Sequence, residues 1–505
     1  MMETIKKDDS YTHILKYTGI FGGVQGLNIL IGIVRNKLVA MILGPEGMGL
    51  MSLFNSTIKL VSDSTNLGIP MSAVREISDA YGSGDEKKVL EIVQLVRAWC
   101  LFTGLAGMLL CMLLSPLLNK WTFAWGDHTL HFVVLSPVVL LMAITAGEMA
   151  ILKALRKLKS LALVSLQVVF CNLLLSVPLY LIWKDTAVVP SIVLIAFIQM
   201  VLTFCYSYRI SRPQFILDKS HLSKGLGMVR IGVAFLIAGV LGSGAEFLIR
   251  TYLNNTGDLE AVGLYNAGFM IVFTYAGMVF QAMETDYFPR LSACPNDSDK
   301  FKEIVNRQVE VSLLLVSPLL CIFIVAAPIA LPLLFSSDFL PVLGMVRIAI
   351  LAMFIRAIAL PIEYISLSKG DSKSFLLLEF FYDVFLVIFV ILGYYFYQLD
   401  GAGFAIVAAG VMGLLVDLVY LYGRYHYSLS KSVVIFFAVQ FSLGVITYLS
   451  SALLGGFLSA AIGISFAFIS LCFSLKVIHS KTHLYESLKE KFMKIFKIKR
   501  NGKLK

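Results

Sequence analysis

The feature that most constrains this chain is its series of long apolar runs. Of its 505 residues 58% are hydrophobic and only 15% are charged. An apolar run of 18 or more residues is typical of a transmembrane helix, in which every backbone polar group is satisfied internally. We place such runs near residues 14–34, 46–68, 92–117, 130–151, 161–183, 187–208, 228–250, 262–284, 309–335, 342–366, 375–397, 401–423, 432–451 and 453–476. The sequence therefore predicts an all-α polytopic membrane protein with about 14 transmembrane helices.

Lysine and arginine positions set the expected orientation. If the N-terminus lies inside, most of the 42 basic residues fall in cytoplasmic segments. The outside loops then hold Arg35, Lys37, Lys120, Lys184 and Arg250. This is the positive-inside pattern, so we expect both termini in the cytoplasm. We also expect the first apolar run to be a retained signal anchor, since no small-residue cleavage site follows it. The net charge of +10 is thereby explained without nucleic acid.

An internal repeat at a nearly constant offset of about 215 residues divides the chain. The matching pairs are Arg35 with Arg250, Arg75 with Arg290, and Lys159 with Lys373. Six helices per copy keep both copies in the same orientation, which is typical of transporters that work by alternating access. We expect two pseudo-symmetric six-helix lobes over residues 1–212 and 213–427, two C-terminal helices over 428–480, and a basic cytoplasmic tail over 481–505.

Polar side chains within the spans and at their ends are the candidate site, because a charged group at the centre of a lone span costs about 2.5–3.5 kcal/mol. Basic groups around a cavity indicate an anionic ligand, and arginine matches phosphate oxygens with two hydrogen bonds. The basic candidates are Arg35, Lys37, Lys59, Arg250 and Arg356; the uncharged lumen candidates are Gln25, Asn28, Asn55, Tyr265 and Asn266; the candidates for ion coupling are Glu246, Glu284 and Glu363. Glu148, Asp383 and Asp417 have no evident partner in the sequence.

Simpler interpretations stand beside these. Glu246 and Arg250 are four residues apart and can pair with each other on one helix face. The seven cysteines are scattered without Cys-x-x-Cys spacing and are expected to be packing residues. Two histidines at 479 and 483 do not make a metal site. We find no nucleotide-binding, zinc-protease or hydrolase motif, so we predict no catalytic residue, no cofactor and no enzyme activity.

Several segments resemble Wzx-type O-antigen and capsule flippases of the multidrug/oligosaccharidyl-lipid/polysaccharide (MOP) exporter superfamily. They are NKLVAMILGPEGMGLMSLF (36–54), REISDAYGSGDEKKVLEIV (75–93), and LIRTYL with AVGLYNAGF (248–269). The resemblance covers nearly the whole chain. It implies a bacterial inner-membrane transporter in lipopolysaccharide, capsule or exopolysaccharide biosynthesis. Such a protein flips an undecaprenyl-pyrophosphate-linked oligosaccharide from the cytoplasmic to the outer leaflet, with its first, second, seventh and eighth helices around a cationic lumen.

The resemblance also assigns residues and partners. Lys37 matches the lysine before the Gly-Pro motif, Arg250 the arginine that ends the seventh helix, and Arg356 a basic position of the tenth span. Asn55 stands where some relatives have an arginine, and Lys59 lies one turn further on. The implied partners are the lipid-linked oligosaccharide, the bilayer, H⁺ or Na⁺, and a polymerase with its chain-length regulator. We expect a monomer.

Three alternatives stay open. A lipid II flippase would share the fold and differ in its head group. A drug/cation antiporter of the same superfamily typically has an acidic residue in its first helix, and residues 14–34 contain none. A membrane glycosyltransferase or O-antigen polymerase would normally carry a sizeable outer loop with catalytic groups, and the predicted outer loops are short.

Overall fold

A computed structural model describes residues 2–123, 125–209, 225–277, 280, 287, 290–292, 299–454 and 456–481. The side chains of residues 2–23, Gln25, Ile231, Asp299 and Phe457 are not among those described. The predictions for Gln25 as a lumen residue, for Glu284 and for the tail 482–505 therefore lie outside the described residues. The elements are α1 (Met2–Thr65), α2 (Ile69–Gly82), α3 (Glu86–Leu113), α4 (Ser115–Thr122), α5 (Thr129–Ala154), α6 (Leu158–Trp183), η1 (Lys184–Ala187), α7 (Val188–Tyr208), α9 (Leu226–Thr256), α10 (Leu259–Phe269), η2 (Met270–Ala276), α12 (Asp299–Leu334), η3 (Ser337–Val342), α13 (Leu343–Ser368), α14 (Ser372–Tyr425), α15 (Lys431–Leu453) and α16 (Gly456–Lys481).

The helices follow the predicted apolar runs. Within the described residues, 11 helical stretches are long and apolar enough to cross a membrane. Three of them, Gly26–Thr65, Leu158–Tyr208 and Ser372–Tyr425, each overlap two of the predicted runs. Every predicted run thus coincides with helix in its described part. The prediction of an all-α polytopic membrane protein is confirmed.

A bend at Gly44 divides α1 into two halves. Gly44 has φ 66° and ψ −173°, a left-handed backbone that a residue without a Cβ adopts readily. Pro45 follows, and its fixed φ and missing N–H suit the first turn of the next helical segment. The bend therefore lies at Gly44-Pro45. Residues 2–43 are called the first half of α1 and residues 45–65 the second half.

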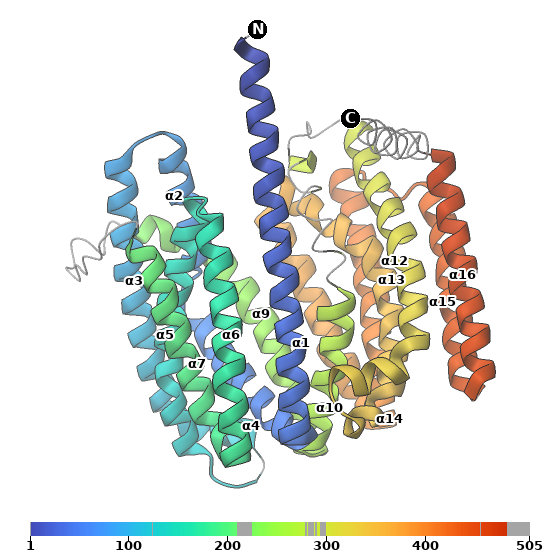
Figure 1. Cartoon of the computed structure of the whole chain (residues 1–505), viewed down its shortest axis with the longest axis horizontal. Coiled ribbons are helices and arrows are strands. Elements are labelled where there is room, and N and C mark those ends of the chain that lie inside the picture. Colours follow the sequence, from blue (N-terminus) through green and yellow to red (C-terminus); the bar gives the residue numbers. More distant parts are fainter. Residues whose placement is uncertain are drawn as a thin grey trace, which may run out of the picture. The chain divides into compact units, whose positions relative to one another are not determined.

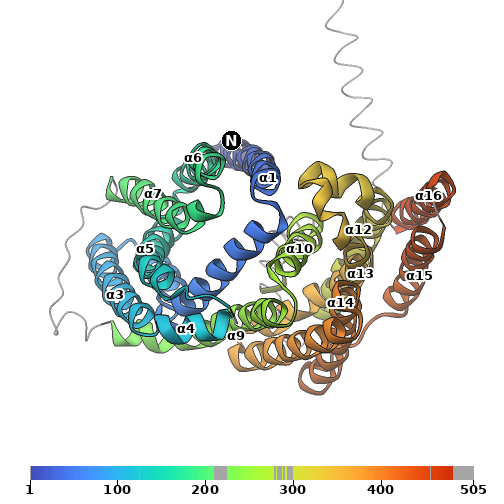
Figure 2. The same cartoon turned by 90° about the horizontal axis from the view of Figure 1, so that it is seen from below.

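The chain forms two compact units. The first unit runs to Ala267 and includes Leu331–Pro341. In it α5, α6 and α7 lie side by side (Figure 1), and α1 packs against all three and against α9. The second half of α1 crosses between α6 and α9 (Figure 2). The expected lobe boundaries at 212 and 427 rest on the repeat, whereas these units rest on packing, so the lobes stay a prediction.

Helix α2 lies between the apolar runs 46–68 and 92–117, in a stretch with no predicted span. Its apolar residues Ile69, Ala73 and Ile77 recur every four positions and are fully buried. They pack in one apolar cluster with residues of α3 and α5, among them Val96 and Ile151. The period of four puts these side chains on one face of the helix. This stretch is therefore mostly an amphipathic helix that covers α3 and α5.

Two glycine contacts join α10 to the second half of α1 and α9 to the turn that follows it. Near Pro45, Gly49 and Gly263 meet so closely that a Cβ on Gly263 would lie 1.9 Å from the Pro45 carbonyl oxygen. Beyond the other end of α1, a Cβ on Gly68 would lie 1.9 Å from the carbonyl oxygen of Gly232. Such distances are far inside van der Waals contact, so only glycine allows these backbones to touch.

The second unit holds Gly268–Ala330 and the chain from Val342 on. α13 packs along α14 and α15, and α15 lies side by side with α16 in both views (Figures 1 and 2). α14 contains two helical segments, because Tyr397 and Gln398 leave helical geometry and the chain reverses there. Residues of α13 are mostly buried, which makes it the central helix of this unit.

Candidate functional site

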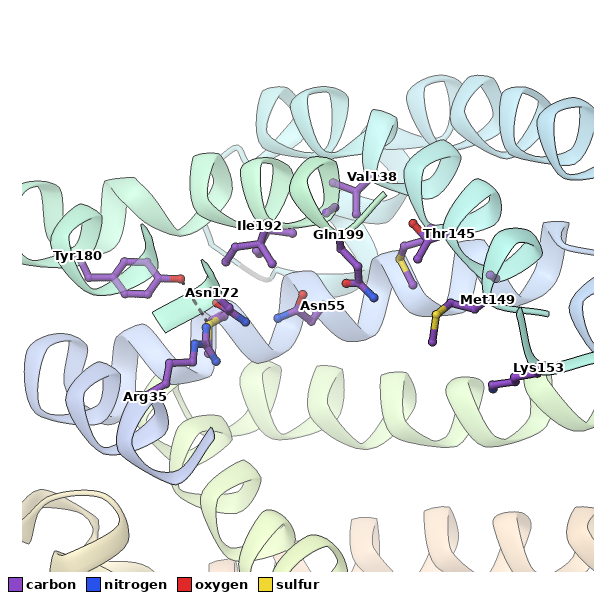
Figure 3. A pocket seen from close by; sticks show the side chains of 15 residues that line it. Arg35, Asn55, Val138, Thr145, Met149, Lys153, Asn172, Tyr180, Ile192 and Gln199 are labelled. Atoms are coloured by element: carbon purple, nitrogen blue, oxygen red, sulfur yellow. Dashed lines mark hydrogen bonds between the residues drawn. The ribbon is translucent and has the colours of Figure 1, made fainter. Parts of the chain in front are cut away.

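A cavity of about 520 Å³ lies within the first unit, between α1, α5, α6 and α7 (Figure 3). Cavities of about 300–1,000 Å³ are typical of small-molecule sites. Both halves of α1 contribute to its wall, so the bend at Gly44 helps to shape it. The lining residues are Arg35, Met51, Asn55, Val138, Met142, Thr145, Ala146, Met149, Lys153, Asn172, Tyr180, Ile192, Ile195, Ala196 and Gln199.

Two basic side chains mark opposite ends of this cavity. Arg35, in the first half of α1, lies beside Asn172 and Tyr180, whereas Lys153, in the last turn of α5, lies beyond Met149 (Figure 3). The Arg35 Nε donates to Ser176 Oγ at 3.4 Å, which steers the guanidinium toward α6. None of the described residues that line the cavity is acidic. The cavity is therefore electropositive and suits an anion.

Three amides occupy the wall between the two cations. Asn55 comes from α1, Asn172 from α6 and Gln199 from α7 (Figure 3). The Asn172 Oδ1 is buried and has no hydrogen-bond partner among the described residues. An unmet acceptor in a cavity is ready to bind a ligand hydroxyl, since a buried polar atom without a partner is costly. Amides offer both donors and acceptors, which matches sugar hydroxyl groups.

Lys37 lies apart from this cavity. Its Nζ donates to the carbonyl oxygens of Pro332 and Leu333 at 2.9 and 3.1 Å. These carbonyls belong to the last turn of α12, where a cation is favoured by the helix dipole. Asn28, also in the first half of α1, has a buried Oδ1 without a partner among the described residues and does not line the cavity.

A second polar group joins α1, α9 and α10 in the same unit. The Glu246 carboxylate accepts from Lys59 Nζ at 3.0 Å and from Arg250 Nη1 at 2.8 Å. The Arg250 Nη2 also donates to Asn266 Oδ1 at 3.2 Å. Four predicted site residues are thus brought together, and Glu246 pairs with Arg250 as the simpler interpretation expected. Tyr265, next to Asn266, is buried and only 2% exposed.

Arg356 lies in the second unit, in surroundings of the opposite charge. It lines a cavity of about 20 Å³, room for one water molecule, together with Glu363, Tyr382 and Asp417. Glu379 is close enough to interact electrostatically with Arg356 and Glu363. Acidic groups therefore outnumber the one base here, and Asp417 acquires the neighbours that the sequence did not reveal.

Several cavity residues were missed by the sequence reasoning. Lys153 follows the predicted run 130–151 and so falls in a predicted cytoplasmic loop, although it reaches the cavity from the end of α5. Thr145, Asn172 and Gln199 lie inside apolar runs, where an uncharged polar residue is itself a signal of a cavity or a neighbouring helix. The internal repeat matches charged residues between its two copies, so it gives no signal for these uncharged ones.

Comparison with known proteins places the chain in a family. The model of a family described as polysaccharide biosynthesis protein matches residues 38–344, more than half of the chain. Among curated proteins, no sequence matches. Three solved structures share the fold at 14% identity. The lipid II flippase MurJ in an inward closed conformation matches with a TM-score of 0.65, covering 92% of this chain and 99% of that chain. A multidrug resistance MATE family transporter of the MOP superfamily in an inward-facing conformation matches with a TM-score of 0.62, covering 79% of this chain and 94% of that chain. A MOP superfamily transporter from Pyrococcus furiosus matches with a TM-score of 0.56, covering 81% of this chain and 93% of that chain. The chain has the fold of the MOP superfamily and belongs to the polysaccharide biosynthesis protein family.

Proposed function

We propose that this protein flips a lipid-linked saccharide with an anionic head group, undecaprenyl-pyrophosphate-linked oligosaccharide, from the cytoplasmic to the outer leaflet of a bacterial inner membrane. The observation that carries the proposal is the cavity of the first unit. Two cations stand at its ends, three amides lie between them, and none of the described lining residues is acidic. The family's description as a polysaccharide biosynthesis protein supports a saccharide cargo.

Each part of the substrate has a matching surface. Phosphate oxygens bind arginine and lysine, with Arg35 offering a planar fork and Lys153 a point charge. Sugar hydroxyl groups bind the amides of Asn55, Asn172 and Gln199. The polyprenyl tail stays in the bilayer, because its apolar surface gains nothing from a polar cavity. The protein then moves the head group and needs no bond to be made or broken, so no enzymatic step is proposed.

The membrane potential supplies a driving force in this proposal. With the cell interior negative, outward movement of each negative charge is favoured by about 2.3 kcal/mol per 100 mV. The empty protein, with its basic cavity, is drawn back toward the inner side. We retain coupling to H⁺ or Na⁺ through Glu246 or Glu363 as an addition to this cycle. The roles proposed for Lys37 and Arg356 in pyrophosphate binding are weaker, since Lys37 binds carbonyls and Arg356 has acidic neighbours.

The direct test is flipping of a lipid-linked oligosaccharide in proteoliposomes at imposed potentials. We expect the rate to rise when the receiving side is positive, and Arg35→Gln to slow it about tenfold. Lys120→Gln is the matched control, because it removes a basic charge from an exposed position of α4 outside the cavity. A rate that ignores the potential refutes the driving force, and an Arg35→Gln protein as active as the control refutes the cavity's role.

The second candidate is a lipid II flippase, favoured by the fold match with MurJ over 99% of that chain. Lipid II also carries a pyrophosphate on a polyprenol, so the same cations would serve it. The two substrates are compared in the same proteoliposomes at equal concentration. Flipping of lipid II and not of the oligosaccharide selects the second candidate. Efflux of a cationic drug would select an antiporter, which the electropositive cavity disfavours.

A further inference from the structure

The polar group formed by Lys59, Glu246, Arg250 and Asn266 is separate from the 520 Å³ cavity, since none of these residues lines it. One carboxylate lies between two cations here. The two oxygens of Glu246 are divided, with Oε1 at 3.0 Å from Lys59 and Oε2 at 2.8 Å from Arg250. An arrangement in which each oxygen meets a different cation is the one that a phosphate-type anion would also adopt.

The solvent exposure of the side chains in this group increases from Arg250 to Lys59. The side chain of Arg250 is 10% exposed, that of Glu246 33% and that of Lys59 46%. A half-exposed ammonium in the middle of a span faces water, because lipid excludes charge. An ion in that water meets Lys59 first and Arg250 last.

The Arg250 guanidinium has a donor left over. Its Nη1 binds Glu246 and its Nη2 binds Asn266, while its Nε is buried and has no acceptor among the described residues. The Nε–H and one Nη–H lie parallel on one edge of the guanidinium plane, and this edge binds two oxygens of one oxyanion. Among the described residues this edge is engaged only by the neutral Asn266 amide, so no described anion occupies it.

We propose that Glu246 is a built-in counter-ion that fills an anion site formed by Lys59 and Arg250, and that a phosphate-bearing head group displaces it. This inference rests on the proposed function. Two uncompensated cations between packed helices are costly, so the empty protein neutralises them with a tethered carboxylate. An incoming phosphate releases Glu246, pairs with both cations and takes the unused edge of Arg250. The carboxylate returns when the head group leaves, which prevents the site from holding its cargo too tightly.

One further charge faces this group. Asp63 lies one turn beyond Lys59 on α1, interacts electrostatically with Lys59 and Glu246, and accepts a hydrogen bond from Ser243 on α9. It stays close to Lys59 when Glu246 is displaced. Arg250 has no second acid described beside it, so we expect Arg250 to gain most from the incoming anion and Lys59 to guide its entry.

Binding of inorganic pyrophosphate to the full chain in lipid nanodiscs, measured by isothermal titration calorimetry, tests the inference. Glu246→Gln removes the competing charge and keeps the side chain's shape, so we expect a dissociation constant about tenfold lower than that of the wild type. Glu260→Gln, which removes the same charge from an exposed position at the start of α10, leaves it unchanged. The double variant Glu246→Gln/Arg250→Gln loses the gain.

An unchanged or weaker affinity in Glu246→Gln overturns the inference, and so does an equal gain in Glu260→Gln, which would show a general charge effect. If Glu246→Gln does not fold, Glu246→Asp is the second variant. Its shorter carboxylate keeps the charge and falls short of one cation, so its affinity lies between wild type and the expected gain, and a wild-type value overturns the inference. Flipping assays separate the two proposals. If the protein transports lipid-linked oligosaccharide but Glu246→Gln does not change pyrophosphate binding, only this inference is refuted. If Glu246→Gln binds pyrophosphate more tightly but the protein does not transport the oligosaccharide, only the proposed function is refuted.

Discussion

At the scale of single residues, a buried ion pair joins three helices of the first unit. The Arg97 Nε on α3 donates to Glu148 Oε1 on α5 at 2.7 Å, and its Nη2 donates to Glu148 Oε2 at 3.0 Å and to Ser207 Oγ on α7 at 3.1 Å. Both charged side chains are only 2% exposed. This two-point geometry gives Glu148 the partner that no sequence pattern revealed, because the two residues lie 51 positions apart.

Removing one member of this pair should destabilise the protein strongly. Glu148→Gln removes the carboxylate charge that faces the buried Arg97 guanidinium, a loss that costs about 3–5 kcal/mol. We expect thermal unfolding in detergent to show this loss, and the double variant Arg97→Met/Glu148→Leu to lose much less than the two single variants together. The exposed pair of Arg307 and Glu303 is the control, since such pairs contribute about 0–1 kcal/mol. Additive losses at positions 97 and 148 would contradict a coupled pair.

A second residue-scale prediction concerns Asn172 in the cavity. Its buried Oδ1 has no partner among the described residues, and it lies beside Arg35 (Figure 3). Asn172→Asp adds a negative charge where an anion is expected, so flipping should slow about tenfold, whereas Asn172→Ala should slow it only a few fold through one lost hydrogen bond. Both rates are measured in proteoliposomes. Equal rates for the two variants would show that charge in the cavity is irrelevant.

At the scale of elements, one carboxylate links the two ends of α14. Asp371, just before its first residue, accepts from the Ser374 backbone N–H at 3.1 Å and the Ser374 hydroxyl at 2.8 Å. It also accepts from the Tyr425 hydroxyl at 2.9 Å, and its carboxylate lies 3.5 Å from the Arg424 guanidinium. Because the chain reverses at Tyr397, one carboxylate caps the start of the first segment and fastens the end of the second.

The pH dependence of stability should reveal this cap. Burial raises the pKa of Asp371, but the hydrogen bonds from Ser374 and Tyr425 and the charge of Arg424 together hold it below its usual value. A depressed folded-state pKa stabilises the protein above the unfolded value of about 4, and this is lost as pH falls through the folded value. Asp371→Ala should cost about 1 kcal/mol at pH 7. The gap in melting temperature between it and the wild type should shrink below about pH 4, and a constant gap would argue against the carboxylate's charge.

The elements themselves could largely be predicted from the sequence, and their partners could not. Lipid requires each spanning backbone to satisfy its own hydrogen bonds, so apolar runs become helices wherever they end up. The bend at Gly44-Pro45 also depends on the local sequence alone, because glycine readily adopts a positive φ and proline has no backbone N–H to donate. Helix α2 was not predicted because its apolar pattern extends over only 14 residues and its burial depends on contacts with α3 and α5. The cavity residue Gln199 escaped because an amide in a span gives no hint of which helices will surround it.

At the scale of the whole molecule, the positive-inside pattern predicts which way the chain crosses the bilayer. Charge bias in the loops sets orientation during insertion. A fluorescent protein fused after residue 505 should fluoresce, because it folds in the cytoplasm, and an alkaline phosphatase at the same place should be inactive, because it needs an oxidising compartment. Phosphatase fused in the turn at Lys184 gives the opposite control. An active phosphatase at the C-terminus would contradict the predicted cytoplasmic position of that end.

The glycine contacts that α9 and α10 make with the second half of α1 and with the turn after it affect how variants of this protein are interpreted. Gly49, Gly68, Gly232 and Gly263 lie where even one methyl group would overlap a backbone oxygen or carbon. None of them lines the 520 Å³ cavity. We therefore expect a mutational scan to rank these four positions among the most sensitive in the chain, although they have no side chain to offer a ligand. Loss of transport there reports a steric limit on backbone contact, so sensitivity alone is a poor guide to the residues that touch the cargo.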